Sequence, residues 1–460
     1  MLVARRIAAV LAAAAVLAAM GGCFPGAGGG NKDGTVTIWT VLVLPNEVER
    51  MESVLSSYTD RTGVETELVA IDPADMPTAV TNAAAAGELP DVLLHTVDLT
   101  QAWASNGILD ADAAASVVAS LDPATFNPTS LDLVSSGGQP VAVPSDGWGQ
   151  VIFYRTDLFE RAGLRPPTTY SAITEAARVL DSGDTAGILA GTSTSTPYTQ
   201  QTFEHLALAN GCELLDSDGE VAFDTPECVH AVERYTTWMT EYSAGGQQDE
   251  LSTRATYLSG RAAMMVWSPH LLDEMNNLST EISPSCDPCE DDPGWLAENT
   301  GFVQRVSGPD GSPVQFGQTL NFGITPHGDV AEAKQLVRSM LSDSYGDLLS
   351  VAPEGQFPMR PDSRGSAGRY VEEWTRAEVG DVDRSRTVGE LLSDGEVTAV
   401  REGATSFRRW GITGGQGELV RALYGEFVVP RALQQVREGT LTPEEATRQV
   451  QQRAEQLNVD

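Results

Sequence analysis

The amino-terminal part of the folded chain alternates between patterns typical of strands and of helices. Short β-branched or apolar runs at 35–39, 64–69 and 90–94 are separated by amphipathic runs at 48–59 and 76–86. Strand, helix, strand, helix and strand in this order, with short connections, is the pattern of a parallel sheet covered by helices. The sequence therefore predicts an α/β fold.

The length of the chain predicts more than one domain. More than 400 residues follow position 34, which is more than a single hydrophobic core usually holds. No repeat of about 20 to 50 residues is visible, so the pattern does not indicate a solenoid. We expect two α/β domains.

The first residues have the features of an export signal. Two arginines precede the apolar run 7–20, which is shorter than the roughly 18 residues of a membrane span. The small residues before Cys23 resemble the lipobox of bacterial lipoproteins, in which the cysteine is lipidated; an ordinary signal peptide is the alternative. We expect a signal peptide over 1–22, a Gly-rich tether over 23–34 and a chain anchored to the outer face of the cell membrane.

The chain is strongly acidic, with a formal net charge of −35. Nucleic acids and anionic lipid surfaces would repel such a chain, so neither is an expected partner. The charge favours a neutral or cationic ligand.

No metal-binding or catalytic motif is visible. The five histidines show no HExxH or other metal-ligand spacing, and there is neither a GxSxG elbow nor a phosphate-binding loop. We therefore expect no cofactor, no metal and no enzymatic activity. A glycosidase needs only two suitably placed carboxylates, and a chain with 64 Asp and Glu residues does not exclude such a pair.

Four cysteines follow Cys23, an even number in a chain with an export signal, and this predicts disulfides. Cys212 and Cys228 flank a turn-rich segment and are expected to pair with each other. Cys286 and Cys289 are expected to form a local loop bond, with a redox or zinc half-site as the alternative. Four cysteines allow three pairings, and the sequence alone does not choose among them.

Six segments occur in the order found in one family. They are PDVLLHTVD (90–98), VPSDGWGQVIFYRTDLFERAGLRPPTTY (143–170), LALANGCELLDSDGEVAFDTPECVHAVERY (206–235), YLSGRAAMMVWSPHLLDEM (257–275), GQTLNFGITPHGDVAEAKQLVRSML (317–341) and GQFPMRPDS (355–363). The ordered set resembles the extracellular solute-binding proteins, family 1, of ABC sugar importers, the class that includes the maltose-binding proteins. Arg155 replaces the asparagine of the family's usual pattern.

The resemblance implies a two-lobed fold of the type II periplasmic-binding-protein kind. Each lobe would hold a mainly parallel sheet flanked by helices, and strands crossing between the lobes would form a hinge that closes on a ligand. In the first crossing, Gly147 and Gly149 would lend backbone freedom. Crossings are expected at 143–151, 300–305 and 341–345, and the lobes would comprise residues 35–145 with 305–342, and 146–304 with 343–460.

Five candidate ligand contacts lie in the first lobe and the first crossing. Trp39 ends the first strand, and strand ends face the ligand crevice in open α/β sheets; a core position is the alternative. The resemblance places His95 and Asp98 where family members often hold a stacking ring and a sugar-binding carboxylate. His95 could instead be a loop histidine with protein partners, and Asp98 could cap a helix. Asp146 and Trp148 lie in the crossing, where Trp148 could simply support the hinge.

The resemblance implies five further ligand contacts. Tyr198 occupies a loop whose aromatic ring stacks on sugar in the family. Trp267 and His270 lie in a segment similar to the family's M-x-x-x-G-P-W, in which His270 stands at the place of the tryptophan and so lacks the expected stacking ring. Asn321 and Arg360 complete the set, with a structural role as the alternative for each.

Together these features predict the substrate-binding lipoprotein of an ABC importer, which captures a mono- or oligosaccharide and delivers it to a membrane permease. The expected chain is a monomer without a cofactor. The alternatives are a protein of the same fold that binds a polyamine or a glycerophosphodiester, and a surface sensor or scaffold.

Overall fold

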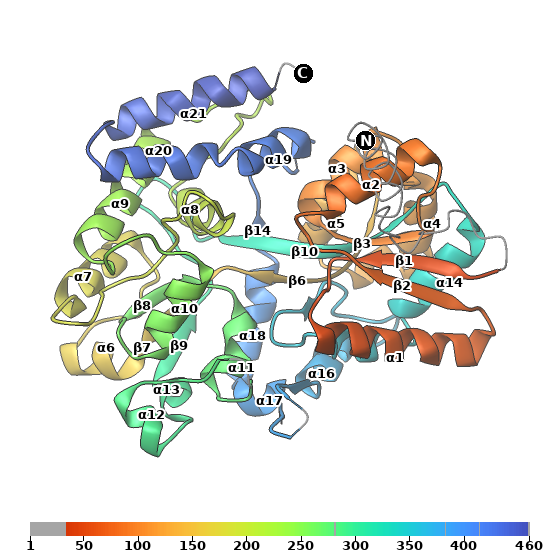
Figure 1. The fold of residues 1–460 in the computed structure, drawn as a ribbon, viewed down its shortest axis with the longest axis horizontal. Helices are drawn as coiled ribbons and strands as arrows, with labels where there is room; N and C mark the ends of the chain where they lie inside the picture. The colour runs from red at the N-terminus through yellow and green to blue at the C-terminus, as the bar shows by residue number, and fades with distance from the viewer. Residues whose placement is uncertain (1–33, 280–281, 382, 414, 459–460) are drawn as a thin grey trace, which may run out of the picture.

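The computed structural model describes residues 34–279, 282–381, 383–413 and 415–458. The predicted signal peptide, Cys23 and most of the tether lie outside these residues. Two larger sheets organise the described chain, one of seven strands and one of three, and helices surround both (Figure 1). In the described ranges, no helix is long and apolar enough to cross a membrane.

The predicted alternation of strands and helices in the amino-terminal part is confirmed. The elements are β1 (Val36–Thr40), α1 (Pro45–Thr62), β2 (Thr66–Ala70), α2 (Met76–Ala86) and β3 (Val92–Thr96). β1 pairs in parallel with β2 on one side and with β3 on the other. The parallel pattern read from the sequence therefore describes this half of the large sheet.

Two long antiparallel strands continue the large sheet. β6 (Val143–Gly149) and β10 (Gln315–Ile324) pair with each other, and β10 also pairs with β3. β11 (Phe357–Pro358) borders β6, and β14 (Phe407–Arg408) pairs with the first residues of β10. β10 is thus bonded to β14 at its start and to β3 at its end.

The three-stranded sheet has β7 (Val151–Arg155) at its centre. β8 (Met264–Trp267) and β9 (Thr300–Val303) flank it, and both pairs are antiparallel. The expectation of a mainly parallel sheet in each lobe therefore does not apply to these three strands. Single parallel bridges from Ala186 to Ala262 and from Leu189 to Met265 extend the sheet beyond β8.

One residue, Gln150, separates β6 in the large sheet from β7 in the small one. Its backbone N–H donates to the carbonyl of Phe316 (3.0 Å), and its own carbonyl accepts from Gln315 Nε2 (3.0 Å). The chain therefore passes from one sheet to the other within the expected crossing at 143–151.

Gly147 and Gly149 do not supply the backbone freedom expected of them. Neither has a positive φ. A Cβ at Gly149 would lie 2.3 Å from Gln315 Nε2, and one at Gly147 would lie 2.5 Å from the carbonyl oxygen of Gln318. Because real Cβ atoms do not come so close to other atoms, these glycines serve to let β10 approach β6.

The second and third passages between the sheets differ from their expected places. β9 belongs to the small sheet, and the chain next enters the large sheet at β10, after the expected crossing at 300–305. β11 still belongs to the large sheet, and α15 (Tyr345–Leu349) packs on α1. Residues 345–358 therefore do not fit the predicted second lobe; the remaining lobe boundaries stay a prediction.

Helices and short segments surround the two sheets (Figure 1). Around the large sheet lie α3 (Val97–Ser105), α4 (Ala111–Leu121), η1 (Pro123–Thr125), α5 (Pro128–Leu133), β4 (Ser135–Ser136), β5 (Gln139–Pro140) and α14 (Val330–Met340). Around the small sheet lie α6 (Thr156–Ala162), α7 (Tyr170–Leu180), α8 (Tyr198–Ala209), α9 (Pro226–Glu241), α10 (Glu250–Leu258), η2 (Pro269–Leu271), α11 (Leu272–Met275), α12 (Asp287–Asp291) and α13 (Trp295–Glu298).

The carboxyl-terminal segments lie low between the two halves and along the upper edge of the half that holds the small sheet in Figure 1. They are α16 (Arg369–Thr375), β12 (Glu378–Val379), β13 (Arg386–Thr387), α17 (Val388–Leu391), α18 (Asp394–Ala404), α19 (Gly417–Gly425), α20 (Val428–Arg437) and α21 (Pro443–Leu457). α18 packs on β6 and β10, and α19 packs on α3. The end of the chain therefore joins the two halves a second time.

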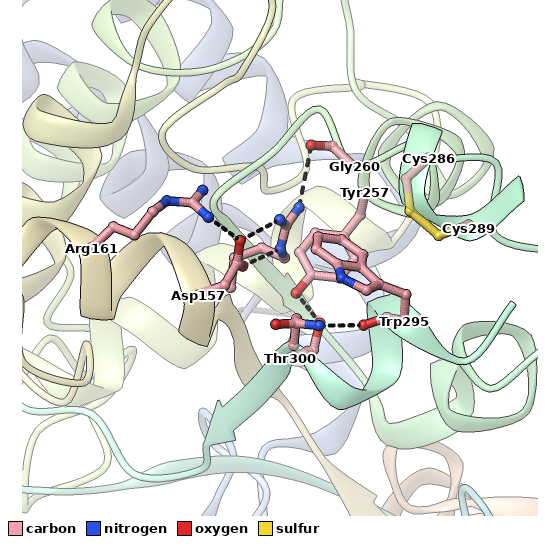
Figure 2. A network of polar contacts seen from close by, with 10 residues as sticks. Asp157, Arg161, Tyr257, Gly260, Cys286, Cys289, Trp295 and Thr300 are labelled. Carbon is pink, nitrogen blue, oxygen red and sulfur yellow. Dashed lines mark hydrogen bonds and ion pairs between the residues drawn. A yellow bond between two sulfur atoms is a disulfide. The ribbon is translucent and has the colours of Figure 1, made fainter. Parts of the chain in front are cut away.

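Arg155, which replaces the asparagine of the family pattern, ties β7 to α6 and α13; its partners Asp157 and Trp295 are labelled in Figure 2. Its Nε and Nη2 donate to the two carboxylate oxygens of Asp157 (2.7 and 2.9 Å), and Arg161 Nη1 also donates to Asp157 Oδ2 (3.0 Å). The guanidinium lies 4.6 Å from the centre of the Trp295 ring, a cation–π distance. Arg155 therefore has a structural role in the small-sheet half.

The two disulfides favoured by the sequence are present, Cys212–Cys228 and Cys286–Cys289. Replacing Cys212 and Cys228 together with Ser is expected to lower the free energy of unfolding by about 3 kcal/mol, because this bond closes a loop spanning 16 positions. Urea unfolding measures the loss. The matched control removes Cys286 and Cys289, which span only 3 positions and should matter less. A larger loss in the control would contradict this account.

Candidate ligand-binding site

Trp148 and His270, both candidates from the sequence, lie against each other near the place where β6 leaves the large sheet. Their ring centres are 6.0 Å apart and nearly perpendicular, and the Trp148 ring lies 6.0 Å from that of Phe316. A Cβ at Gly355 would fall 1.9 Å from His270 Nε2, so the missing side chain there makes room for the imidazole. Both residues are partly exposed, as ligand contact requires.

A cavity of about 30 Å³ lies beside Trp148. Its walls are mostly apolar and come from both sheets and the segments around them, including Val151, Phe153, Leu272, Phe357, Trp374 and Phe407. Such a volume holds at most about two waters, so a sugar ring does not fit into it. A ligand would therefore contact the exposed parts of Trp148 and His270. Alternatively, the walls of the cavity would have to move apart to admit it.

Asp146 lies on β6 two residues before Trp148, and alternate residues of a strand share a face. Ser145 Oγ donates to Asp146 Oδ2 (2.7 Å), whereas Oδ1 has no hydrogen-bond partner among the described residues. Asp146 is 3% exposed. Burial raises its pKa to about 7, and the charge of Glu47 adds to the rise. A buried carboxylate with an unused oxygen is costly unless a donor reaches it.

Glu47 repels both Asp146 and Glu354, Asp273 also repels Glu354, and Glu354 lines the same cavity as Trp148; we name Glu47, Asp146, Asp273 and Glu354 the acidic cluster. Glu47 lies in the first turn of α1, Asp273 on α11, and Glu354 between α15 and β11. Burial raises the pKa of Glu354 to about 7 and that of Asp273 to about 6, and it also raises that of Glu47. The charges of Asp273 and Glu47 further raise the pKa of Glu354. The cluster therefore gathers negative charge from both halves of the molecule.

Asp98 belongs to a different polar group, which is centred on a buried ion pair. Arg409 Nε lies 3.1 Å from Glu204 Oε1, and these side chains are 2% and 0% exposed. Arg409 Nη1 donates to Gln318 Oε1, and Gln318 Nε2 donates to Asp98 Oδ1 (3.2 Å). Tyr424 Oη donates to Glu204 Oε2 (2.7 Å). Asp98 is therefore tied through β10 to the other half of the molecule, and it does not cap α3, whose N-cap is Thr96.

Trp39, His95 and Asn321 are covered by protein. His95 is fully buried, its ring lies 4.9 Å from that of Trp103, and burial lowers its pKa to about 4. Asn321 faces His95 across the β3–β10 pair and is also fully buried. Trp39 is 6% exposed. The structure thus places these three candidates in the sheet interior, and their role as ligand contacts stays a prediction.

Tyr198 and Trp267 form a buried pair behind His270. Their ring centres are 4.6 Å apart, and Tyr198 Oη donates to the carbonyl of Val266 (2.8 Å). The guanidinium of Arg254 lies 5.9 Å from the centre of the Trp267 ring. In this arrangement the pair supports the segment that carries His270 and presents little surface to a ligand.

Arg360 is a structural residue, so its assignment as a ligand contact does not match the structure. It is 3% exposed. Its guanidinium donates to Thr125 Oγ1 (2.8 Å), to Tyr370 Oη (3.2 Å) and to the carbonyls of Leu121 (2.9 Å) and Leu341 (2.5 Å). All three of its nitrogens are thus engaged by the protein.

The sequence reasoning missed Glu47, Asp273 and Glu354. Glu47 follows the carboxyl end of β1, the location that drew attention to Trp39, so the rule on strand ends could have found it. Glu354 immediately precedes the quoted segment 355–363. For the Glu204–Arg409 pair no sequence signal exists, because its partners are 205 positions apart.

Comparisons with known proteins agree with this fold. The family model for bacterial extracellular solute-binding proteins matches residues 45–278. YcjN of Escherichia coli K12, named as an ABC transporter periplasmic-binding protein, is 24% identical over 305 residues. That match covers 65% of this chain and 66% of YcjN, just under two thirds of its length.

Solved structures show the same fold over almost the whole chain. Maltose-bound MalE3 of T. maritima has a TM-score of 0.69 at 18% identity, covering 92% of this chain and 99% of MalE3. The GacH receptor of Streptomyces glaucescens also has a TM-score of 0.69 at 18% identity, covering 94% and 100%. With about half of its length matched by the family model, the chain belongs to the family of bacterial extracellular solute-binding proteins.

Proposed function

We propose that the protein is the substrate-binding component of an ABC importer and captures a carbohydrate near Trp148. The observation that carries the proposal is the partly exposed Trp148–His270 pair beside the acidic cluster. Aromatic rings offer faces on which sugar C–H groups stack, and carboxylates accept hydrogen bonds from hydroxyls. The similarity to MalE3, solved with maltose, and to GacH, solved with acarbose, supports a carbohydrate ligand.

Capture would use a change in the relative orientation of the two sheets. The short link at Gln150 and the segment between β9 and β10 are the connections that such a motion would bend. A ligand that contacts both halves favours the closed arrangement, because it binds that arrangement more tightly. The closed, loaded form would then deliver its sugar to the permease.

The cellular setting belongs to the same proposal. The signal at 1–22 would export the chain, and lipidation of Cys23 would hold it as a monomer at the outer face of the membrane. The Gly-rich tether would give the folded body reach toward the permease. The match to a family of extracellular proteins supports this location.

Replacing Trp148 with Ala is expected to raise the Kd for the sugar about 10- to 100-fold, because an aromatic stacking face is lost. A thermal-shift screen of neutral mono- and oligosaccharides first identifies the ligand through its stabilisation of the wild-type chain. Titration calorimetry on the wild type and on Trp148→Ala then gives the ratio of Kd values.

The control for Trp148→Ala is Trp295→Ala, which also removes a partly buried tryptophan but lies beside Arg155, at the end of β7 away from the link at Gln150. It should leave the Kd unchanged. An equal loss of affinity in both variants would show that Trp148 does not contact the ligand directly. Release of new reducing ends during incubation would show a hydrolase and overturn the proposed function.

A further inference from the structure

We infer that the acidic cluster selects a carbohydrate that carries a protonated amino group. This inference rests on the proposed function and makes its substrate class more specific. It places the amino group of the ligand among Glu47, Asp146, Asp273 and Glu354, next to the Trp148–His270 pair.

The first argument is unbalanced charge. No ion pair among the described residues includes a member of the acidic cluster. Arg50 is close enough to lower the pKa of Glu47 and Glu354. Its guanidinium, however, donates to the carbonyls of Ser350 (3.1 Å), Val351 (3.2 Å) and Gly380 (3.1 Å). Arg254 also lowers the pKa of Asp273 but is paired with Glu274. Four carboxylates near two cations that are already engaged by other groups favour a cationic ligand group.

The second argument is the unused oxygen of Asp146. Asp146 is 97% buried, shares a strand face with Trp148, and within the described chain nothing donates to its Oδ1. A neutral sugar hydroxyl could donate one hydrogen bond to it. An ammonium group donates up to three and also neutralises the charge that burial makes costly. The ammonium group is therefore the better match.

The third argument is the state of the neighbouring imidazole. Burial lowers the pKa of His270 to about 4, so the ring next to Trp148 is uncharged at neutral pH. It therefore does not repel a cationic ligand, and a neutral imidazole keeps one acceptor nitrogen, which the indole ring of the family's tryptophan lacks. The replacement at position 270 suits a more polar ligand.

Acidification should weaken the binding of the amine. Since the pKa values of Asp146 and Glu354 are about 7 and that of Asp273 is about 6, these groups take up protons as pH falls from 7 to 5, where the sugar amine stays protonated, and the attraction fades by about tenfold in Kd. The charged and titratable groups that face the cluster are Glu47 and Arg50 of α1, Asp146 of β6, Tyr345 of α15, Arg254 of α10, His270 of η2, Asp273 of α11, Glu354, and Asp381.

The experiment compares matched probes by titration calorimetry at pH 7.5 on the full mature chain. The pairs are glucosamine with glucose and the chitosan disaccharide with cellobiose, and spermidine serves as an amine without a sugar. We expect an amino sugar to bind at least about tenfold more tightly than its neutral partner. Glu354→Gln and Asp273→Asn should each reduce that preference about fivefold or more.

The matched control is Glu88→Gln, which removes the same charge from an exposed turn before β3. Because β3 runs parallel to β1, this turn lies at the edge of the sheet opposite to Glu47. The control should keep the full preference. An equal loss of preference in Glu88→Gln and Glu354→Gln would show only the general field of the acidic chain and would overturn the inference.

The outcomes separate this inference from the proposed function. Equal or tighter binding of the neutral partner overturns the inference and leaves a carbohydrate-binding protein. Binding of spermidine without any sugar overturns the proposed carbohydrate function while keeping an amine site. Failure of every probe counts against both. A preference for the amino sugar that does not fall between pH 7 and 5 contradicts the role of the cluster.

Discussion

Replacing Arg409 with Met is expected to lower the free energy of unfolding by about 3–5 kcal/mol. The change leaves Glu204 charged and fully buried without its ion-pair partner, and an uncompensated buried charge carries a penalty of this size. It also removes the guanidinium that lies 4.5 Å from the centre of the Phe316 ring. Urea unfolding followed by tryptophan fluorescence measures the loss.

A surface arginine provides the control for Arg409→Met. Arg305 lies 3.3 Å from Glu402 with both side chains largely exposed, so Arg305→Met should cost less than about 1 kcal/mol. Adding Glu204→Gln to Arg409→Met should recover part of the loss, because the unpaired charge is then absent. Similar losses at positions 409 and 305 would show that the buried pair has no special importance.

Replacing Asp146 with Asn is expected to stabilise the protein at pH 8 by up to about 4 kcal/mol and to have little effect near pH 4. The pKa of Asp146 is about 7 in the folded chain, against an ordinary value of 3.8. Above pH 7 the wild type therefore buries an ionised carboxylate, at about 1.4 kcal/mol for each pKa unit of difference. As pH falls from 7 toward 4 the folded form takes up a proton that the unfolded form does not, and the wild type recovers.

Unfolding curves at pH 8, 6 and 4.5 for the wild type and Asp146→Asn test this prediction. Asp132→Asn, at an exposed position of α5, is the control and should show no such pH dependence. A destabilised Asp146→Asn at pH 8 would mean that the carboxylate has a partner that lowers its cost. If Asp146→Asn both stabilises the protein at pH 8 and weakens the binding of an amine, then Asp146 lowers the stability of the fold but is needed for binding.

Local patterns were enough to predict the amino-terminal strands and helices. β1, β2 and β3 are short apolar runs bounded by helical patterns, and such signals depend only on neighbouring residues. The pairing of Cys212 with Cys228 was also a local inference, since both flank one turn. The pairing of β11 with β6 joins residues about 210 positions apart, and no periodicity within either segment reports it.

The candidate site was predicted in part, for a similar reason. Trp148, His270 and Asp146 were identified because they lie in or beside segments that resemble the family. His95 and Asn321 stand at family positions as well, but strand pairing buries them against each other. Whether a residue of a strand faces a ligand or the core depends on register and on the segment packed above it, and neither can be read from one sequence.

The two-ended pairing of β10 has a mechanical consequence. Its start pairs with β14 and its end with β3, and Gly317 and Gln318 between them pair with the last residues of β6, just before the link at Gln150. A rotation between the halves about that link would therefore have its axis close to Gln318. Points near a rotation axis move little and distant points move far. Trp148 pairs with Gln318 and so would lie close to that axis. During closure, the atoms that contact a ligand at Trp148 would move by short distances, whereas the outer helices would move much further. A partner protein that binds the outer helices would therefore distinguish the closed form from the open form without contacting the sugar.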